Sequence, residues 1–535
     1  MGVLRYSFSR YWELSRSLRK RQVVIVLVNL VVSYLNIRFA LMLRDTINSP
    51  DTERILILGA FLVLINALSF VVTYLLDVSK RAMQVEIIGR IYRKILHAKE
   101  KTFRAKTPGE YLTDLISNVV YVSSLAAALI PALVVNAVSF GGYLIALFLL
   151  SPRLSLVLLP FLMVTVLLFK KQVGELAKVS AKERSRFSML VERIRTKLEG
   201  RKTIRNTNAL NGAIRKLNEE CGGWYNSVKS LVLASLKYRY LYYTLYRLVP
   251  LISVLVGLLW KVDTGTLVAF YMMAGEIIEP LVVILSDLSH VPESYPPLKR
   301  IDEALNMEEE SFGEKTLERV DSIELKNVSY SEILENVNLK ISRGESIGII
   351  GESGSGKTTL ANIIACHYRP ESGEVLINGL PAFEFRNPRE KILLVETNEF
   401  VFPGTVRENV TLWEEFDEKE LEEAMRMAKV DLPPDEKIGP GNREVSLGER
   451  QRIALARALI RKPDVLILDE ALSGVDSDVE AEIIEKIKAK GVTLIAISHR
   501  PSITGLVDRV VLVENRTVKE LSGGRGKIEG SELFS

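Results

Sequence analysis

Long apolar runs dominate the chain up to about residue 297, and a mixed polar pattern follows. A helix that crosses a membrane needs roughly 20 apolar residues. Runs of at least that length lie at Gln22 to Leu43, Ile55 to Leu76, Val119 to Phe169, Tyr240 to Trp260 and Leu267 to Leu288. The third run is long enough for two spans and is interrupted by Ser151-Pro152-Arg153. The pattern therefore predicts six transmembrane helices.

Basic side chains gather in two long segments between these spans, at Lys80 to Lys106 and at Lys170 to Lys237. Lys and Arg are enriched in loops on the cytoplasmic side of a membrane. We therefore expect both segments and both termini to be cytoplasmic, with the spans in the cell's inner (plasma) membrane. The amphipathic stretch Tyr6 to Leu18 is expected to lie on the cytoplasmic membrane face. The alternative, a large soluble protein with buried core helices, does not account for the charge asymmetry.

Composition argues against two further features. The formal net charge is +5 over 535 residues, which is too small to indicate a nucleic-acid partner. The two cysteines, Cys221 and Cys366, fall in segments expected to be cytoplasmic. We therefore expect no structural disulfide.

A glycine-rich loop follows the β-prone run Ser346 to Ile350 and precedes a helix-like run. The loop and the start of the helix comprise Gly351, Glu352, Ser353, Gly354, Ser355, Gly356, Lys357, Thr358 and Thr359. Glycines let backbone N–H groups close around phosphates, and a helix N-terminus adds its positive end. We expect Lys357 to reach the terminal phosphates of ATP and the Thr358 hydroxyl to ligate Mg²⁺.

Two later β-prone runs end in chemically active residues. Asp469 and Glu470 directly follow the run Asp464 to Leu468. Ser498 and then His499 follow the run Thr493 to Ile497. An acidic pair also suits a helix N-cap, and a lone histidine is usually structural. Downstream of a phosphate loop, however, strand ends of this kind lie beside the phosphates. We expect Asp469 to hold Mg²⁺, Glu470 to polarise the attacking water, and His499 to contact the γ-phosphate.

Further motifs in both halves point to one family. They are Thr107 to Leu112, Thr264 to Phe270 and Lys299 to Glu303 in the apolar half, and Phe402, Gly404 to Thr405, Arg407 to Asn409, Arg452 to Ala458 and Ser473 to Asp476 in the polar half. With these motifs the chain resembles the ATP-binding cassette (ABC) exporters over nearly its whole length. The resemblance predicts a membrane all-α domain of six helices at residues 1–300, a linker at 301–321 and an α/β P-loop nucleotide-binding domain at 322–535.

The resemblance also implies a dimer of such subunits with two ATP molecules between the nucleotide-binding domains. Each nucleotide would contact the phosphate loop of one subunit and the signature loop of the other, here represented by Ser446, Gly448 and Glu449. Asp476 belongs to the D-loop, a neighbouring motif. Closure on ATP and reopening after hydrolysis would switch the membrane helices between inward-facing and outward-facing states.

The signature loop departs from the family pattern. The usual Leu-Ser-Gly-Gly-Gln reads Val445-Ser446-Leu447-Gly448-Glu449. Leu447 replaces a glycine where backbone approaches phosphate, and Glu449 adds negative charge in place of a neutral amide. We expect both changes to weaken the contact with ATP.

Two other positions also differ. The family's Q-loop glutamine, which contacts the metal, aligns with Thr397, and either the Thr397 hydroxyl or the neighbouring Asn398 is expected to replace it. The aromatic residue that stacks on adenine falls in a shortened hairpin. This leaves Tyr330, whose alternative role is ordinary strand packing.

Two functions remain open. In the first, ATP hydrolysis drives export of a solute; in the second, the chain is a nucleotide-gated or regulatory subunit with little turnover. Glu470 and His499 favour the pump, whereas the altered signature favours the second function or an asymmetric pump. Because a partner with a sound signature would restore the site built on Glu470, we favour a heterodimer with a second half-transporter over a homodimer.

The sequence does not identify the substrate, which is a small molecule, lipid or peptide. Acidic and aromatic residues near the fifth and sixth spans are Glu276, Glu279, Tyr238, Tyr240, Tyr242 and Tyr243. They either line a cavity for cationic amphiphiles or serve as helix contacts and an interfacial aromatic belt.

Overall fold

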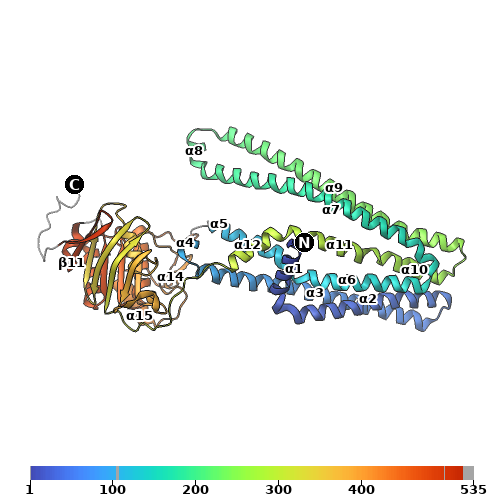
Figure 1. Cartoon of the computed structure of the whole chain (residues 1–535), viewed down its shortest axis with the longest axis horizontal. Coiled ribbons are helices and arrows are strands. Elements are labelled where there is room, and N and C mark those ends of the chain that lie inside the picture. The colour runs from blue at the N-terminus through green and yellow to red at the C-terminus, as the bar shows by residue number, and fades with distance from the viewer. Residues whose placement is uncertain (1, 104–107, 499–500, 522–535) are drawn as a thin grey trace. The chain divides into compact units, whose positions relative to one another are not determined.

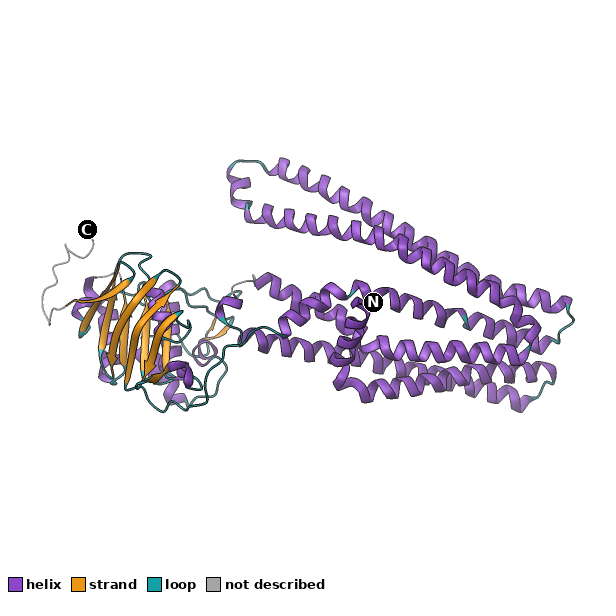
Figure 2. Cartoon of the chain, in the orientation of Figure 1, coloured by secondary structure: helices purple, strands orange, loops and turns teal. Residues whose placement is uncertain are grey.

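The chain forms two compact units, residues 1–98 with 102–308 and residues 99–101 with 309–535. The computed structural model describes residues 2–103, 108–498 and 501–521. Within these residues the first unit is helical and the second combines helices with strands (Figure 2). The predicted fold class, an all-α membrane domain followed by an α/β P-loop domain, is confirmed.

The helices of the first unit are α1 (Gly2–Leu14), α2 (Arg19–Asn48), α3 (Thr52–Leu96), α5 (Pro108–Thr113), α6 (Val119–Leu150), α7 (Pro152–Glu199), α8 (Arg201–Asn206), α9 (Leu210–Leu259), α10 (Thr264–Glu276), α11 (Ile278–Glu293) and α12 (Tyr295–Leu305). The residues of the short α4 (Glu100–Phe103) are divided between the two units, with 100–101 in the second and 102–103 in the first. Six spans in the described residues are long and apolar enough to cross a membrane, with α10 and α11 together forming the last. Pro152 starts α7 because proline suits the first turn of a helix and cannot continue the preceding one.

Helices α7 and α9 are much longer than a membrane is thick. They contain 48 and 50 residues, or roughly 70 Å at 1.5 Å per residue, against about 30 Å of hydrocarbon. They run side by side and are joined through α8 (Figure 1). Between them, Glu220 accepts hydrogen bonds from Arg193 at 2.9 Å and Lys197 at 2.6 Å. The predicted basic segment at residues 170–237 is therefore an extension of two transmembrane helices.

A six-stranded sheet forms the centre of the second unit, in the order β12-β11-β3-β10-β9-β6. Its strands are β3 (Ser346–Ile350), β6 (Ile392–Glu396), β9 (Val465–Asp469), β10 (Thr493–Ile497), β11 (Arg509–Glu514) and β12 (Thr517–Leu521). All pairs are parallel except β11 with β12. Strands β3, β9 and β10 are buried along their whole length, as expected for a parallel sheet covered on both faces.

Helices pack around this sheet, and a smaller antiparallel sheet lies against it. The helices are α13 (Lys357–Ile364), α14 (Val406–Thr411), α15 (Glu418–Met427), α16 (Leu447–Leu459) and α17 (Ser477–Ala489). The smaller sheet has the order β2-β1-β4-β5, from β1 (Ser322–Tyr330), β2 (Leu334–Ser342), β4 (Ser372–Ile377) and β5 (Leu380–Pro381), while β7 (Gly404–Thr405) pairs with β8 (Lys437–Ile438).

The segment before β1, predicted as a polar linker, is hydrogen-bonded along the second unit. The Gly313 N–H donates to the Phe383 carbonyl at 2.7 Å, and the Lys315 N–H donates to the Glu384 carbonyl at 3.1 Å. A Cβ added at Gly313 would lie 2.0 Å from the Glu384 carbonyl oxygen, so only glycine fits this approach. Residues 313–315 are therefore hydrogen-bonded to the rest of the second unit.

Candidate active site

The glycine-rich loop connects β3 to α13 at the carboxyl edge of the central sheet. Gly351, Gly354 and Gly356 have φ angles of +152°, +83° and +103°, in the region that favours glycine. A Cβ at Gly351 would lie 2.4 Å from the Val513 carbonyl oxygen, so no larger residue fits there. A backbone of this kind, leading into a helix N-terminus, is suited to binding an anion.

Lys357 is the first residue of α13 and is only 6% exposed. Its ammonium group donates to the carbonyl oxygens of Gly351 at 2.9 Å and Glu352 at 2.7 Å. Burial lowers the pKa of Lys357, while the charges of Glu470 and Asp469 oppose this shift. Since desolvation disfavours the charged amine, a phosphate in the loop would stabilise it more than the two carbonyls do.

The loop fits the triphosphate of ATP in a second way. The Ser355 hydroxyl is buried and has no hydrogen-bond partner among the described residues. A buried hydroxyl without a partner is costly, and a phosphate oxygen would supply one. Thr358 is exposed beside it and Thr359 is half-buried, so the Thr358 side chain is free to face a ligand.

The two acids at the end of β9 lie at the same edge of the sheet. Asp469 is 5% exposed and pairs in register with Glu396 of β6 and Ile497 of β10. Glu470 has a φ of +51° and donates its N–H to the Ile497 carbonyl at 3.0 Å. A left-handed backbone at a residue with a side chain costs about 1–3 kcal/mol and is typical of functional sites.

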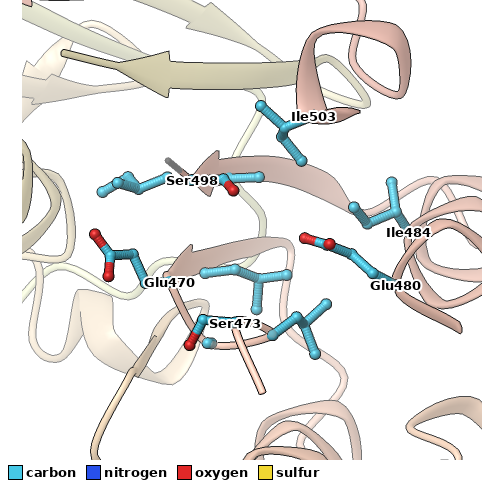
Figure 3. A pocket seen from close by; sticks show the side chains of 11 residues that line it. Glu470, Ser473, Glu480, Ile484, Ser498 and Ile503 are labelled. Atoms are coloured by element: carbon cyan, nitrogen blue, oxygen red, sulfur yellow. The ribbon is translucent and has the colours of Figure 1, made fainter. Parts of the chain in front are cut away.

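A cavity of about 150 Å³ lies beside the carboxyl ends of β9 and β10, and Glu470 is part of its lining (Figure 3). Its lining includes Ser473 and Ser498, and the carboxylate of Glu480, 5% exposed, points from α17 toward the strand ends. His499, predicted to contact the γ-phosphate, lies outside the described residues, as does Thr107 of the membrane-half motif. The contact of His499 therefore stays a prediction.

Thr397, at the position of the family's Q-loop glutamine, follows β6 directly. Its hydroxyl donates to the backbone carbonyl of Asp469 at 3.0 Å, whereas Asn398 is exposed. No group of three or more His, Cys, Asp or Glu among the described residues is placed to hold a metal. A Mg²⁺ ion here would therefore rely on Asp469, the hydroxyls of Thr358 and Thr397, and oxygens of the ligand itself.

The signature residues form the N-terminus of α16. Ser446 is the N-cap, its hydroxyl accepts from the Glu449 N–H at 3.2 Å, and the Glu449 carboxylate accepts from the Ser446 N–H at 2.8 Å. Arg443 donates to the same carboxylate at 2.8 Å. The Ser446 N–H is the main cause of the lowered pKa of Glu449. This carboxylate therefore serves the helix cap, while Leu447 remains 45% exposed at the helix start.

Sequence reasoning missed Gln451, which connects the motifs. This side chain is fully buried; its amide N–H donates to the Ser473 hydroxyl at 3.0 Å, and its carbonyl accepts from the Gly474 N–H at 2.8 Å. Weaker contacts of 3.4 and 3.5 Å reach the carbonyls of Thr397 and Glu470. The only sequence signal was its position two residues after the signature loop.

The remaining predicted residues lie nearby in the fold. Asp476 is the exposed N-cap residue of α17, and a Cβ at Gly448 would lie 2.6 Å from the Gly474 carbonyl, so the signature helix packs on the D-loop. Tyr330 stacks on Tyr368, with ring centroids 5.3 Å apart and planes 8° apart. One face of the Tyr330 ring is therefore covered by Tyr368. The stacking of Tyr330 on adenine stays a prediction.

The structure thus brings two groups of predicted residues together. One contains the phosphate loop, Asp469, Glu470 and Thr397 at the sheet edge; the other contains the signature residues and Asp476. Gln451 joins the two. Tyr330 belongs to neither group, although the side chains of Ile333 and Leu334 in the same hairpin lie beside Gly356.

Comparison with known proteins matches both halves to one family. Residues 22–266 match the family model described as ABC transporter transmembrane region, and residues 334–473 match the family model described as ABC transporter. A putative export ATP-binding/permease protein of Rickettsia bellii is 27% identical, covering 98% of this chain and 97% of the relative. An ATP-dependent lipid A-core flippase of Burkholderia pseudomallei is 26% identical over 86% of this chain and 82% of the relative. A cyclolysin secretion/processing ATP-binding protein of Bordetella pertussis is 27% identical over 100% of this chain and 79% of its own.

Proposed function

Because this chain belongs to the ABC transporters, with a transmembrane region fused N-terminal to the ATP-hydrolysing domain, we propose that a dimer of such subunits uses ATP hydrolysis to export a solute by alternating access. The chain is a multi-pass membrane protein and a transporter ATPase. The observation that carries the proposal is the shared sheet edge, where the phosphate loop, Asp469 and Glu470 come together. The membrane is proposed to be the cell's inner (plasma) membrane, with the N-terminus and the ATPase domain in the cytoplasm.

We assign nucleotide binding, metal binding and hydrolysis to different residues of the site. ATP supplies the phosphoanhydride bond, and Mg²⁺ neutralises charge on its phosphates. The loop N–H groups and Lys357 bind the phosphates, with Lys357 exchanging its two carbonyl partners for phosphate oxygens. Thr358, Asp469 and Thr397 are the proposed metal-holding residues.

Glu470 is the proposed residue that orients the attacking water and accepts its proton. Its left-handed backbone and its hydrogen bond to Ile497 fix the direction in which the carboxylate leaves the strand. Gln451 is the proposed positioning residue, because it holds the D-loop beside the end of β9. His499 is proposed to contact the γ-phosphate.

We further propose that the functional dimer contains a second, different half-transporter. Each composite site takes its phosphate loop from one subunit and its signature from the other. This chain keeps the phosphate loop, Asp469 and Glu470, whereas the signature carries an exposed Leu447 at the helix start. A partner with an ordinary signature would make the Glu470 site competent and leave the other site slow.

Transport in inside-out vesicles separates this proposal from a nucleotide-gated or regulatory subunit. For a pump, a candidate solute should accumulate above its external concentration only with hydrolysable ATP, and that solute should stimulate the ATPase rate. The Glu470→Gln vesicles serve as the matched control. Equilibration of the solute without accumulation, opened equally by a non-hydrolysable ATP analogue, would instead support the gated subunit.

A further inference from the structure

Helix α1 lies against the rest of the first unit along one side. Ser7, Tyr11, Leu14 and Leu18 recur at helical spacing and are each at most 4% exposed, as expected for the packed face of an amphipathic segment. The Tyr11 hydroxyl donates to the hydroxyl of Ser294, the C-cap residue of α11. This side of α1 is therefore occupied by protein.

Asp302 of α12 fixes the rotation of α1. The Arg10 Nε donates to both oxygens of the buried Asp302 carboxylate, at 2.8 Å each, and the Tyr6 hydroxyl donates to the same carboxylate. Charge-assisted hydrogen bonds of this kind are stronger than neutral ones and add geometric specificity. Because α1 is held at several points of one side, its opposite side is turned away from the helices that hold it.

Trp12 and a group of basic residues make up this opposite side and the start of α2. Trp12 is 50% exposed, and Arg16, Lys20 and Arg21 are exposed as well. The Arg19 guanidinium lies over the Trp12 ring, 4.3 Å from its centroid, which is a cation–π contact. An aromatic ring and four cations are thus presented together.

This group lies where the chain enters its first membrane span. A short 3₁₀ turn at Ser15–Leu18 joins α1 to α2, and α1 runs across the direction of α2 (Figure 1). The first apolar run begins at Gln22, directly after the basic residues. Tryptophan is enriched at the level of the lipid headgroups, and a helix with a basic, aromatic side lies along that surface. The group is therefore placed at headgroup level.

The four cations are not neutralised within the part of the chain that the structure describes. Arg16, Lys20 and Arg21 have no ion-pair partner there. Arg19 donates one hydrogen bond, to the Trp12 carbonyl, and at 3.4 Å this bond is long. The guanidinium and ammonium groups thus keep donors for an anion.

Two acids approach the same segment, and both have other partners. Glu13 pairs with Arg10, and the Glu86 carboxylate of α3 accepts from the Ser17 hydroxyl at 2.6 Å. The segment therefore retains its positive charge beside the span. A cluster of Lys and Arg in this position attracts anionic lipids.

We propose that Trp12, Arg16, Arg19, Lys20 and Arg21 form a binding surface for the headgroup of an anionic phospholipid. The basic side chains bind the negatively charged phosphate, while Trp12 packs against the glycerol and the first acyl carbons. A zwitterionic lipid binds less well, because the positive group of its headgroup lies beside the same cations. The inference goes beyond the proposed export function and does not depend on ATP hydrolysis.

Quenching of Trp12 fluorescence by brominated lipids tests the inference. The full chain, with its partner subunit if one co-purifies, is placed in nanodiscs of equal parts phosphatidylglycerol and phosphatidylcholine. The acyl chains of one lipid carry bromine in the first sample and those of the other lipid in the second, so both bilayers have the same headgroups. Subtracting the spectrum of Trp12→Phe in the same bilayer removes the signal of every other tryptophan. Labelled phosphatidylglycerol should quench Trp12 at least about twofold more than labelled phosphatidylcholine.

Neutral variants identify the residues responsible. Combined replacement of Arg16, Arg19, Lys20 and Arg21 by glutamine should make the two labelled lipids quench Trp12 equally. The matched control removes the same charge from α8 and the start of α9, by replacing with glutamine the exposed residues Arg201, Lys202, Arg205 and Arg215. This control should keep the preference for phosphatidylglycerol. Retained ATP binding shows that each variant is folded.

Salt provides a second test, on the chain without substitutions in the basic group. Raising NaCl from about 0.05 M to about 0.5 M screens exposed charges and should reduce the preference. Equal quenching by the two lipids at low salt, or a preference unchanged by high salt, overturns the inference. It is also overturned if the four-residue variant keeps the preference or the control loses it. Absence of quenching by either lipid overturns it as well, since a protein surface would then cover Trp12.

Discussion

At the scale of single residues, the signature loop shows how the structure changes the meaning of a substitution. The sequence suggests that Leu447 and Glu449 both harm the contact with ATP. In the structure the Glu449 carboxylate closes a capping box with Ser446 and pairs with Arg443. The Glu449 carboxylate is therefore already bound by the helix cap and by Arg443. Leu447, in contrast, keeps an exposed side chain where phosphate would approach.

The two positions should therefore respond differently to restoration of the family residue. With the other site silenced by Glu470→Gln, Leu447→Gly should raise the residual ATPase rate by about threefold or more, because it opens the N-terminus of α16 to the nucleotide of the site that this signature completes. Glu449→Gln should change the rate by less than about twofold, since glutamine also completes a capping box. Steady-state ATPase assays on both variants, in the assembled transporter, measure this. The opposite order of effects would show that charge at Glu449 is the main defect.

At the scale of elements, α13 links the phosphate loop to a charged cluster at its other end. Arg389 donates to the Cys366 carbonyl, at 2.8 Å and 3.2 Å, and to Glu310 at 2.7 Å. His367 lies beside this cluster, and burial, together with the positive charge of Arg389, lowers its pKa to about 4. The ring is therefore neutral in the folded protein at pH 7.

This lowered pKa predicts a pH dependence of stability. In the unfolded chain His367 should titrate near its ordinary pKa of 6.5. The unfolded state then binds more protons between about pH 6.5 and 4, so the free energy of unfolding is highest above this window and falls as pH decreases through it. Across the whole window the loss is on the order of 3 kcal/mol.

Thermal unfolding of the wild type and of His367→Gln at pH 7.5 and pH 5 separates the effect of His367 protonation from that of carboxylate protonation. The wild type should lose more stability than the variant between the two pH values. Parallel losses in both proteins would mean that His367 is not responsible.

The sequence predicts the position of an element well where one residue type, such as proline or glycine, determines it. Ser151-Pro152 separates two spans because proline starts α7, and the glycines of residues 351–356 form the predicted loop between β3 and α13. The Ser446-to-Glu449 spacing is itself a capping-box pattern and could have been recognised. Pro280 likewise signalled the break in the last span.

Other features depend on tertiary contacts that no local pattern reveals. Gln451 is important because two segments far apart in the sequence, the one after β6 and the one after β9, converge on it. The stacking of Tyr330 on Tyr368 depends on packing between β1 and the segment after α13. The attachment of residues 313–315 to the second unit is equally non-local.

At the scale of the whole molecule, the unequal quality of the two half-sites predicts a mixed dimer. Co-expression with a homologous half-transporter, followed by purification through a tag on this chain alone, should recover both subunits. In that complex, mutation of Glu470 should remove most of the ATPase activity, because the partner's signature completes that site. Recovery of a self-associated species with vigorous ATPase activity would contradict the heterodimer.

We propose that this chain hydrolyses ATP through Glu470 at the edge of the central sheet. The most direct measurement is the steady-state ATPase rate of the assembled, lipid-reconstituted transporter with Glu470→Gln, alongside ATP affinity in the same sample. We expect a loss of hydrolysis of about 100-fold or more with ATP affinity changed less than about threefold, since Lys357, Thr358 and Asp469 still hold the nucleotide. Lys357→Ala should instead lose ATP affinity itself. A Glu470→Gln rate within a few-fold of wild type would mean that Glu470 is not the catalytic residue.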